Sequence, residues 1–204
     1  PLGVEWAAEH LPAIVEAWAP GMYAGQAVAE ILYGKVNPSA KLAITIPRSV
    51  GQLQMIYNHK PSQYFHPYAV KPSTPLWPFG YGLSYTTYKY DDLKLSAKEV
   101  SQNQNVEVSV KVTNTGQRDG VEIVQLYIRD KYSSVTRPVK ELKDFARVAL
   151  KAGESKVVTF TITPDKLAFY DKKMKWIVEP GEFVVMAGAS SADESLLKET
   201  FILK

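Results

Sequence analysis

The sequence predicts a mixed architecture, in which a partial α/β segment is followed by an all-β sandwich of the immunoglobulin-like type. Three observations lead to this prediction. A strand–helix–strand pattern occupies the chain up to residue 46. The segment Pro75–Thr86 then gathers four aromatic residues, two glycines and two prolines into twelve positions. From Tyr88 onward, short alternating runs separated by turns continue to the end of the chain.

The first region is predicted to hold one right-handed crossover unit of an α/β sheet. Ala13–Trp18 is a short apolar run ended by Pro-Gly, which suits a buried strand. Ala24–Tyr33 carries apolar residues on one helical face, and Gly34 stands where a helix end favours the left-handed conformation. Leu42–Ile46 is predicted as a second strand, stopped by Pro47. One such unit cannot bury both faces of its strands, so the other strands of the sheet must come from residues outside this sequence.

Residues 50–74 have weak periodicity, which predicts a long ordered loop or an extended arm. The Pro75–Thr86 junction is predicted to be a defined turn, since proline fixes φ and glycine permits backbone geometry closed to other residues. We expect its aromatic side chains to be buried between the two regions and its glycines to allow a close approach of the backbone. These residues are Phe79, Tyr81 and Tyr85, with Gly80 and Gly82.

The last region is predicted to be a sandwich of about seven strands. Val106, Val108, Val110 and Val112 alternate with polar residues, which is the period-two pattern of a half-buried strand. Turn residues such as Asp119-Gly120 separate this run from the next. The further strands are expected at Val121–Arg129, Phe145–Leu150, Lys156–Thr163, Phe183–Ala189 and Leu196–Leu203.

Other short segments follow one another in a characteristic order: Pro12–Gly21, Gly25–Gly34, Asn37–Leu42, Ile46–Ser49, Tyr57–Pro61, Val112–Gly116, Arg137–Leu142, Gly153–Ser155 and Glu179–Gly181. Together with the P-x-x-P-F-G-Y-G-L-S-Y-T junction, they resemble family 3 glycoside hydrolases. In that family the junction joins the second catalytic domain, an α/β sandwich, to a fibronectin type III-like domain. The resemblance therefore implies that 1–49 is the end of the α/β sandwich domain, 50–87 a connecting arm and junction, and 88–204 the fibronectin type III-like domain.

The resemblance also implies an activity for the whole enzyme. The chain would be the C-terminal segment of a retaining β-glucosidase-type hydrolase that cleaves terminal β-linked glucose or a related sugar. Its partners would be the N-terminal barrel and remaining α/β sandwich of the same enzyme, a β-glucoside or oligosaccharide substrate, and a second copy in a homodimer. An alternative is a stand-alone carbohydrate- or protein-binding module with a flat row of exposed aromatics. A purely structural, dimer-forming sandwich is a third.

No catalytic residue is assigned in this sequence. Retaining glycosidases need two carboxyl groups about 5 Å apart, and in the resembled family these are an Asp of the barrel and typically a Glu upstream of Pro1. No residue here matches either motif. Carboxylates such as Glu5, Glu9, Glu16 and Glu30 fall at positions typical of solvent-exposed glutamate. The segment is therefore expected to be structural, and inactive on its own.

Composition narrows the other possibilities. The net charge is only +3 and the lysines are scattered, so the sequence does not predict a basic surface that binds nucleic acid. No apolar run is long enough for a membrane span. The absence of cysteine excludes disulfides and thiolate metal sites. It leaves the compartment open, with a periplasmic or secreted bacterial location favoured over the cytoplasm. His59 and His66 lack the spacing of a ligand pair, so neither a metal nor a cofactor is expected.

Aromatic residues are concentrated between the two regions, at Tyr57, Tyr64, Phe65, Tyr68 and Trp77. One interpretation is an interface core, in which these rings bury area while their polar ends find partners. The other is a rim of the sugar cleft, because aromatic faces pack against the C–H surfaces of pyranoses. In that interpretation, Tyr64 or Phe65 of the arm borders the leaving-group side of the substrate.

Overall fold

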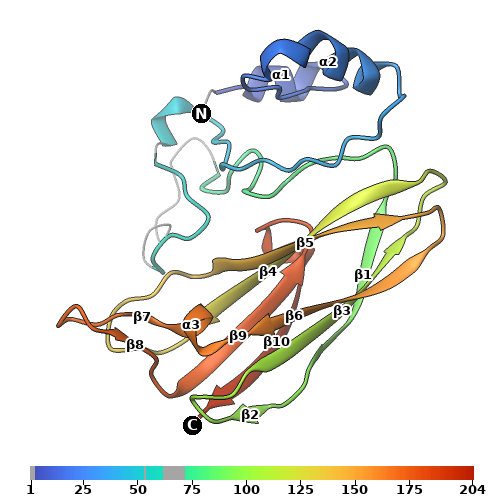
Figure 1. The fold of residues 1–204 in the computed structure, drawn as a ribbon. Helices are drawn as coiled ribbons and strands as arrows, with labels where there is room; N and C mark the ends of the chain where they lie inside the picture. The colour runs from blue at the N-terminus through green and yellow to red at the C-terminus, as the bar shows by residue number, and fades with distance from the viewer. Residues whose placement is uncertain (1–2, 53, 62–71) are drawn as a thin grey trace.

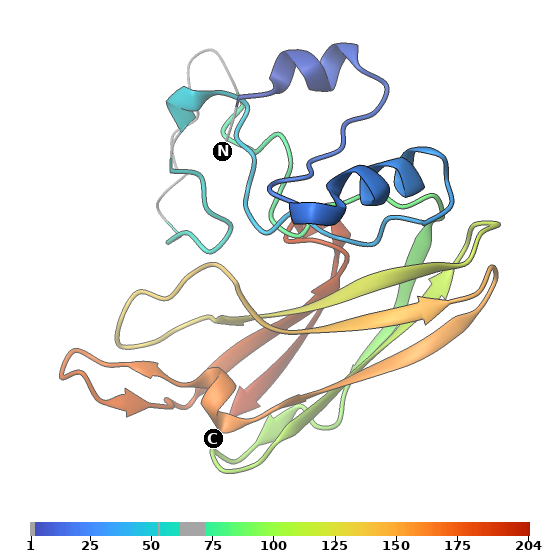
Figure 2. The same ribbon diagram turned by 45° about the horizontal axis from the view of Figure 1, so that its top comes forward.

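The structure is a computed structural model that describes residues 3–52, 54–61 and 72–204. Two β-sheets face each other, and the N-terminal segment lies across one side of them, next to strands β4 and β5 (Figures 1 and 2). The sandwich therefore forms the base of the molecule, and the segment before residue 53 forms a second layer on top of it.

The sandwich has one sheet of three strands and one of five, with antiparallel pairing except between β10 and β2. The smaller sheet, in spatial order, contains β1 (Tyr88–Leu95), β3 (Val106–Asn114) and β6 (Ser155–Ile162). The larger sheet contains β2 (Glu99–Val100), β10 (Leu196–Leu203), β9 (Gly181–Gly188), β4 (Gly120–Asp130) and β5 (Glu141–Leu150). This arrangement confirms the predicted sandwich, and each strand expected after residue 105 is present with ends shifted by a few residues at most.

The core between the sheets follows from the period-two pattern of the sequence. The four valines of β3 at positions 106, 108, 110 and 112 are at most 1% exposed. Opposite them, β4 contributes Val124, Leu126 and Ile128, while Phe183 and Phe201 of β9 and β10 stack at a centroid distance of 5.4 Å. Burial of this apolar area supplies the main driving force for folding of the sandwich.

Three short elements complete the sandwich. Helix α3 (Pro164–Leu167) follows β6, and a two-stranded hairpin then pairs β7 (Phe169–Tyr170) with β8 (Trp176–Ile177). The 3-10 turn η3 (Asp193–Ser195) connects β9 to β10. The hairpin projects from the end of the sandwich that lies away from helices α1 and α2 (Figure 1).

The N-terminal segment is helical but contains no sheet within its described residues. It comprises α1 (Glu5–His10), the turn η1 (Gly21–Tyr23), α2 (Ala24–Leu32) and the turn η2 (Val50–Gln52). The helix predicted at 24–33 is confirmed, and Gly34 follows it with the expected positive φ of 70°. Helix α1 was not expected from the sequence.

The two strands predicted in this segment are wrong for this chain. Residues 13–18 are exposed and form no ladder, and of residues 42–46 only Ile46 makes a bridge, to Trp77. A strand is held by hydrogen bonds to a neighbouring strand. Residues 13–18 have no such neighbour among the described residues. Residues 42–46 bond to the junction only at their two ends, Leu42 with Gly80 and Tyr81 and Ile46 with Leu76 and Trp77. Residues 13–18 have the apolar character of a buried strand but are exposed, whereas Thr45 and Ile46 are buried by other described parts of the chain.

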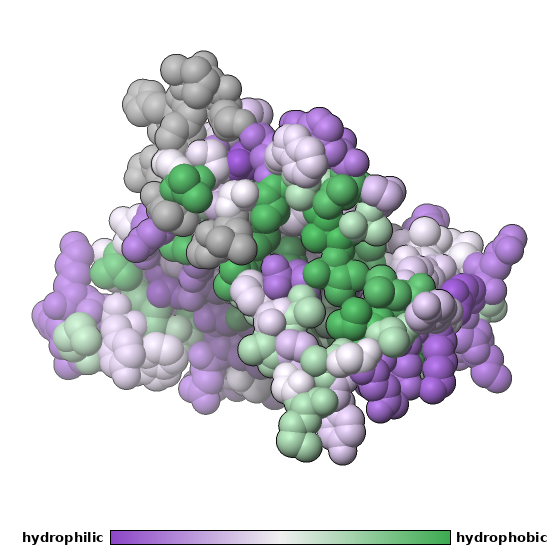
Figure 3. All heavy atoms as spheres, turned by 90° about the horizontal axis from the view of Figure 1, so that it is seen from above, coloured by the Kyte–Doolittle hydropathy of each residue, from purple (hydrophilic) through white to green (hydrophobic). Residues whose placement is uncertain are grey.

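A broad apolar surface covers the side of the N-terminal segment that faces away from the sandwich. The molecule seen from this side carries a continuous area of hydrophobic residues (Figure 3). Large apolar side chains of this segment that are more than 40% exposed are Trp6, Leu11, Ile14, Val15, Trp18, Met22, Tyr23, Leu32, Tyr33, Val36 and Val50. Apolar patches of this extent mark surfaces that contact another protein surface.

Candidate functional site

The candidate site is the interface between the N-terminal segment and the sandwich, where the arm and the junction meet strand β4. The predicted rim residues Tyr64 and Phe65 lie outside the described residues, as do Tyr68 and His66. Among the residues that are described, no group of three or more His, Cys, Asp or Glu side chains is placed to hold a metal ion. The site is therefore built from the start of the arm, the junction and the facing surface of the sandwich.

Three aromatic rings connect the arm to the sandwich. Tyr57 stacks on Phe79 of the junction at 4.2 Å between ring centroids, and its edge meets Tyr127 of β4 at 5.8 Å. The Tyr57 hydroxyl accepts a hydrogen bond from the Leu142 backbone N–H at 3.2 Å. Burial raises the pKa of both Tyr57 and Tyr127, so the two phenols remain protonated. Tyr57 thus belongs to the interface core, which is the first of the two interpretations of the aromatic cluster.

The junction approaches β4 as closely as its glycines allow. Gly80 has a φ of 78°, and a Cβ built on it would lie 2.1 Å from Oε1 of Gln125. The Gln125 amide donates to the carbonyl oxygens of Gly80 (3.1 Å) and Ala189 (2.7 Å) and accepts from the Tyr127 hydroxyl. A Cβ on Gly82 would meet the carbonyl oxygen of Ala40 at 2.6 Å. The close backbone approach predicted for both glycines is confirmed.

The burial predicted for the junction aromatics is only partly correct. Phe79 and Tyr81 are half-buried, whereas Tyr85 is 43% exposed. The Tyr85 ring lies under the Arg118 guanidinium, 5.4 Å from its centroid, and its hydroxyl donates to the Ile31 carbonyl at 2.7 Å. Tyr85 is therefore held at the edge of the interface by its polar end and ring face, and it is not a core residue.

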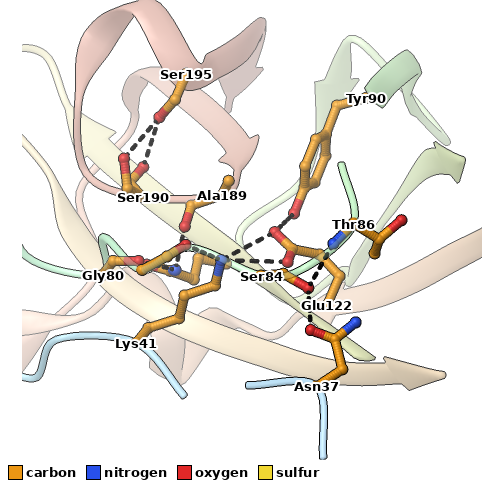
Figure 4. A network of polar contacts seen from close by, with 12 residues as sticks. Asn37, Lys41, Gly80, Ser84, Thr86, Tyr90, Glu122, Ala189, Ser190 and Ser195 are labelled. Atoms are coloured by element: carbon orange, nitrogen blue, oxygen red, sulfur yellow. Dashed lines mark hydrogen bonds and ion pairs between the residues drawn. The ribbon is translucent and has the colours of Figure 1, made fainter. Parts of the chain in front are cut away.

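A buried ion pair crosses the interface beside the junction (Figure 4). The Lys41 ammonium lies 3.2 Å from Oε2 and 3.4 Å from Oε1 of Glu122, which lies near the start of β4 and is 1% exposed. The Tyr90 hydroxyl donates to Glu122 Oε1 at 2.8 Å, and Lys41 also donates to the Gly82 carbonyl at 3.1 Å. Burial, and then the Glu122 charge, raise the pKa of Tyr90, so this phenol stays a donor. The pair joins the N-terminal segment to both sheets.

Sequence reasoning missed this ion pair, although β4 carries a signal for it. Glu122, Val124, Leu126 and Ile128 share one face of the strand by period two, and the other three are core residues. A glutamate at an inward-facing position must have a buried partner, since an unpaired buried carboxylate is costly. The sequence motif Asn37–Leu42 contains the partner, Lys41, but nothing in its local pattern indicates the contact.

A second polar group lies next to the ion pair (Figure 4). The Asn37 side chain accepts from the Ser84 hydroxyl and the Tyr85 backbone N–H, both at 2.8 Å, and donates to the Asp119 carbonyl at 2.9 Å. The Thr86 hydroxyl donates to the side chain of Asn114 at 2.6 Å. These bonds connect the Asn37 turn, the end of the junction and the sandwich turns, which fixes the angle between the two layers.

Lys140 holds the loop before β10 against the junction. Its ammonium is buried, donates to the Ser191 carbonyl at 2.8 Å and lies 3.2 Å from the Asp193 carboxylate. The Ser191 backbone N–H in turn donates to the Phe79 carbonyl at 2.9 Å. Burial lowers the pKa of Lys140, and the Asp193 charge offsets part of that effect. These bonds hold the loop before β10, the junction and the start of β5 together.

An open apolar pocket lies beside the aromatic group. It has a volume of about 340 Å³ and is lined by Ala43, Ile44, Thr45, Met55, Tyr57 and Phe79, among others. Its walls come from the residues predicted as the second strand, from the arm and from the junction. A pocket with this lining offers apolar contact and no acid or base, so it is suited to receive an apolar side chain of an adjoining surface.

The comparisons with known proteins extend over the whole chain. Residues 1–85 match the family model described as the glycosyl hydrolase family 3 C-terminal domain, and residues 122–191 match the fibronectin type III-like domain. A β-xylosidase of Formosa agariphila is 44% identical over 207 residues, which is 100% of this chain and 29% of that protein. A periplasmic β-glucosidase of Salmonella typhimurium is 43% identical over 94% of this chain and 26% of its own length.

Solved structures agree with these matches. A β-glucosidase of Erythrobacter marinus has a TM-score of 0.96 at 45% identity, covering 100% of this chain and 27% of that one. A Listeria innocua β-glucosidase in complex with glucose has a TM-score of 0.91 at 36% identity, covering 100% and 29%. The chain thus spans between a quarter and a third of the length of these relatives.

Proposed function

The chain belongs to glycoside hydrolase family 3, and on that premise we propose that it is the C-terminal segment of a retaining β-glucosidase-type enzyme. The enzyme hydrolyses terminal β-linked glucose or a related sugar. The observation that carries this proposal is the agreement of fold and sequence over the full chain with β-glucosidases, one at a TM-score of 0.96. Because one relative is named a β-xylosidase, the proposal includes sugars related to glucose.

Within this enzyme the segment has a supporting role. The apolar side of residues 3–50 receives the remainder of the α/β sandwich domain, and the exposed apolar run at 13–18 completes its sheet. The Lys41–Glu122 pair and the Gly80–Gln125 contact hold the N-terminal segment and the junction in a fixed position on the sandwich. Two carboxylates supplied by other parts of the enzyme perform the chemistry with net retention.

The first prediction concerns activity. The purified 204-residue chain is expected not to hydrolyse aryl β-glucosides, because it supplies neither catalytic carboxylate. The complete enzyme is expected to hydrolyse them, and NMR of the first-formed sugar should show the β-anomer, as retention requires. Turnover by the isolated chain that survives removal of trace contaminants would contradict the supporting role. Release of the α-anomer by the complete enzyme would contradict the retaining mechanism.

We propose further that the arm borders the leaving-group side of the substrate through Tyr64 or Phe65. The start of the arm is well anchored, since Tyr57 lies in the interface core and the Val139 backbone N–H donates to the His59 carbonyl at 3.0 Å. The Lys60 ammonium also donates to the Thr136 carbonyl. Loops whose ends are held by a rigid scaffold commonly carry binding residues.

The second prediction tests this placement by kinetics. In the complete enzyme, Tyr64→Ala or Phe65→Ala should lower kcat/KM for disaccharides about tenfold more than for small aryl glucosides, a difference of about 1.4 kcal/mol. The matched control is Tyr170→Ala, which removes a 57% exposed ring from the β7–β8 hairpin and should change neither value. An equal loss on both substrates, together with a lower melting temperature, would leave the arm only a structural role.

A periplasmic or secreted location is proposed for the enzyme. The Salmonella typhimurium relative is named a periplasmic β-glucosidase. Within the described parts of the chain, none of the helices has the length and apolar character needed to cross a membrane. The homodimer suggested by the sequence stays a prediction, which the mass of the complete enzyme in solution would test.

A further inference from the structure

The β7–β8 hairpin presents exposed side chains that take no part in the interface site. It projects from the end of the sandwich that lies away from helices α1 and α2 (Figures 1 and 2). Tyr170 pairs with Trp176 across its two strands, so both rings lie on one face, where they are 57% and 53% exposed. The preceding residue, Phe169, points to the other face and is 2% exposed. The hairpin is therefore packed on the sandwich through one face and presents two rings on the other.

Asp171 fixes the turn between the two strands. Its carboxylate accepts hydrogen bonds from the backbone N–H groups of Lys173 at 2.7 Å and of Lys175 at 2.9 Å. The Met174 N–H donates to the Asp171 carbonyl at 3.0 Å, and Met174 itself has a φ of 59°. A positive φ is uncommon outside glycine and persists where the surrounding bonds impose it. The turn therefore holds the Met174 side chain, which is 74% exposed, at its tip.

Three lysines lie next to this methionine in the sequence. Lys172, Lys173 and Lys175 are exposed, and none of them forms an ion pair with a described residue. Asp171 is the only acidic residue between positions 169 and 177, so three lysines and one aspartate give this segment a formal charge of +2. The tip thus combines positive charge with an exposed apolar side chain.

The charged residues around the base of the hairpin nearly cancel one another. On α3, on the start of β5 and on the adjoining loops, these residues are Arg137, Glu141, Lys143, Asp144, Asp165, Lys166 and Glu179. Three are basic and four are acidic. Arg137 and Lys143 pair with Glu141, and Lys166 pairs with Asp144. The excess positive charge is therefore concentrated at the tip.

The shape and chemistry of the tip indicate a lipid surface as its partner. A sugar chain packs on coplanar rings, but the Tyr170 and Trp176 rings are inclined by 57° at a centroid distance of 4.8 Å. At a membrane surface, tryptophan and tyrosine lie at the level of the headgroups, and lysines attract anionic lipids. Apolar side chains reach the boundary of the acyl chains. Each exposed group of the tip matches one of these layers.

We propose that the β7–β8 hairpin docks the enzyme on the surface of a bilayer that contains anionic phospholipids. Met174 enters the boundary between headgroups and acyl chains, and Trp176 lies at the level of the headgroups. The ammonium groups of Lys172, Lys173 and Lys175 contact lipid phosphates. Penetration is limited to the tip, because Phe169 belongs to the face that is packed on the sandwich. This peripheral attachment goes beyond the proposed function.

The test is sedimentation of the complete enzyme with vesicles of phosphatidylcholine alone and of equal parts of phosphatidylcholine and phosphatidylglycerol. The enzyme should sediment with the anionic vesicles and not with the neutral ones, and less of it should sediment as the salt concentration rises. The triple variant Lys172→Gln, Lys173→Gln, Lys175→Gln should lower the partition coefficient about a hundredfold, since each lysine contributes about fivefold. Trp176→Ala should lower it about tenfold.

The matched control removes the same charge from another part of the sandwich. Lys89, Lys98 and Lys204 each have a side chain that is 65% exposed. The triple variant Lys89→Gln, Lys98→Gln, Lys204→Gln has the same net charge as the hairpin triple variant. At physiological ionic strength, where charges far from the contact are screened, it should bind anionic vesicles as the wild type does.

A second readout separates lipid contact from a structural role. Met174→Gly removes the apolar side chain, but glycine adopts a φ of 59° without strain. The variant should therefore keep the melting temperature of the wild type while its partition coefficient falls about tenfold. A lower melting temperature with unchanged vesicle binding would show that Met174 serves the fold alone, and it would overturn the assigned contact.

Three further outcomes would overturn the proposal. The first is the absence of binding to the anionic vesicles. The second is an equal loss in the two triple variants, which would reduce the effect to the net charge of the enzyme. The third is binding of neutral hydroxyethyl cellulose that Trp176→Ala abolishes, without binding to vesicles, which would make the hairpin a glycan-binding element. Hydrolysis of aryl glucosides is measured without vesicles, so failure of this proposal is distinguishable from failure of the proposed function.

Discussion

Replacing Lys41 by methionine is expected to lower the unfolding free energy of the chain by about 3–5 kcal/mol, because the change leaves the Glu122 carboxylate buried without its cation. The side chains of Lys41 and Glu122 are 12% and 1% exposed, so water cannot take the place of the ammonium. The Tyr90 hydroxyl would remain as a partner of the carboxylate. Since domains are stable by about 5–15 kcal/mol in total, the loss would be evident in urea unfolding.

The control for this prediction is Lys35→Met, which breaks the pair between Lys35 and Glu30 at 2.8 Å. That lysine side chain is 73% exposed, so its removal should cost less than about 1 kcal/mol. The double variant Lys41→Met with Glu122→Leu should recover much of the lost stability, because no unpaired charge is then buried. Equal costs for Lys41→Met and Lys35→Met would show that Glu122 finds water or another partner.

The second large effect is expected for Gly80→Ala, at about 2–5 kcal/mol of unfolding free energy. Part of this comes from the φ of 78°, which an alanine adopts at a cost of about 1–2 kcal/mol. The remainder comes from Gln125, whose amide must move away from the new methyl group. That amide is 3% exposed and bonded to Gly80, Ala189 and Tyr127, so its movement leaves buried groups unpaired.

Gly153→Ala isolates the backbone contribution. Gly153 has nearly the same φ, 77°, but nothing lies within 4 Å of the position its Cβ would take. Its cost should therefore be about 1–2 kcal/mol, from the left-handed conformation alone. Thermal unfolding of both variants measures the difference. If the two substitutions proved equally costly, the Gln125 amide would have room to rearrange, and the junction would be less tightly seated than its geometry indicates.

The sandwich could be predicted from the sequence because each strand carries its own evidence. The alternating valines of β3 pair with β6 over eight residues, and the turns at Asp119-Gly120 and Ala152-Gly153 limit the neighbouring strands. Alternation also determines which face of each strand enters the core. The pairing across the interface could not be predicted in this way, since the contact of Lys41 with Glu122 joins residues 81 positions apart.

The N-terminal segment shows the opposite case. Its helix α2 was predictable from local spacing and from Gly34, because a helix satisfies its own backbone groups. The runs at 13–18 and 42–46 have strand composition, but a strand depends on neighbours that composition cannot supply.

The contacts that hold the N-terminal segment have a consequence for the order in which the molecule assembles. The Arg118 guanidinium donates to the Gly34 carbonyl across 84 residues, and the Lys41 pair closes a loop of similar length. Closing such loops costs chain entropy before the sandwich fixes the partners, whereas paired strands such as β9 and β10 are joined by a short connection. We therefore expect the sandwich to fold first and the N-terminal segment to dock on it afterwards. By the same reasoning, amide hydrogens of α2 exchange through a partial opening of lower free energy than those of β3 and β4.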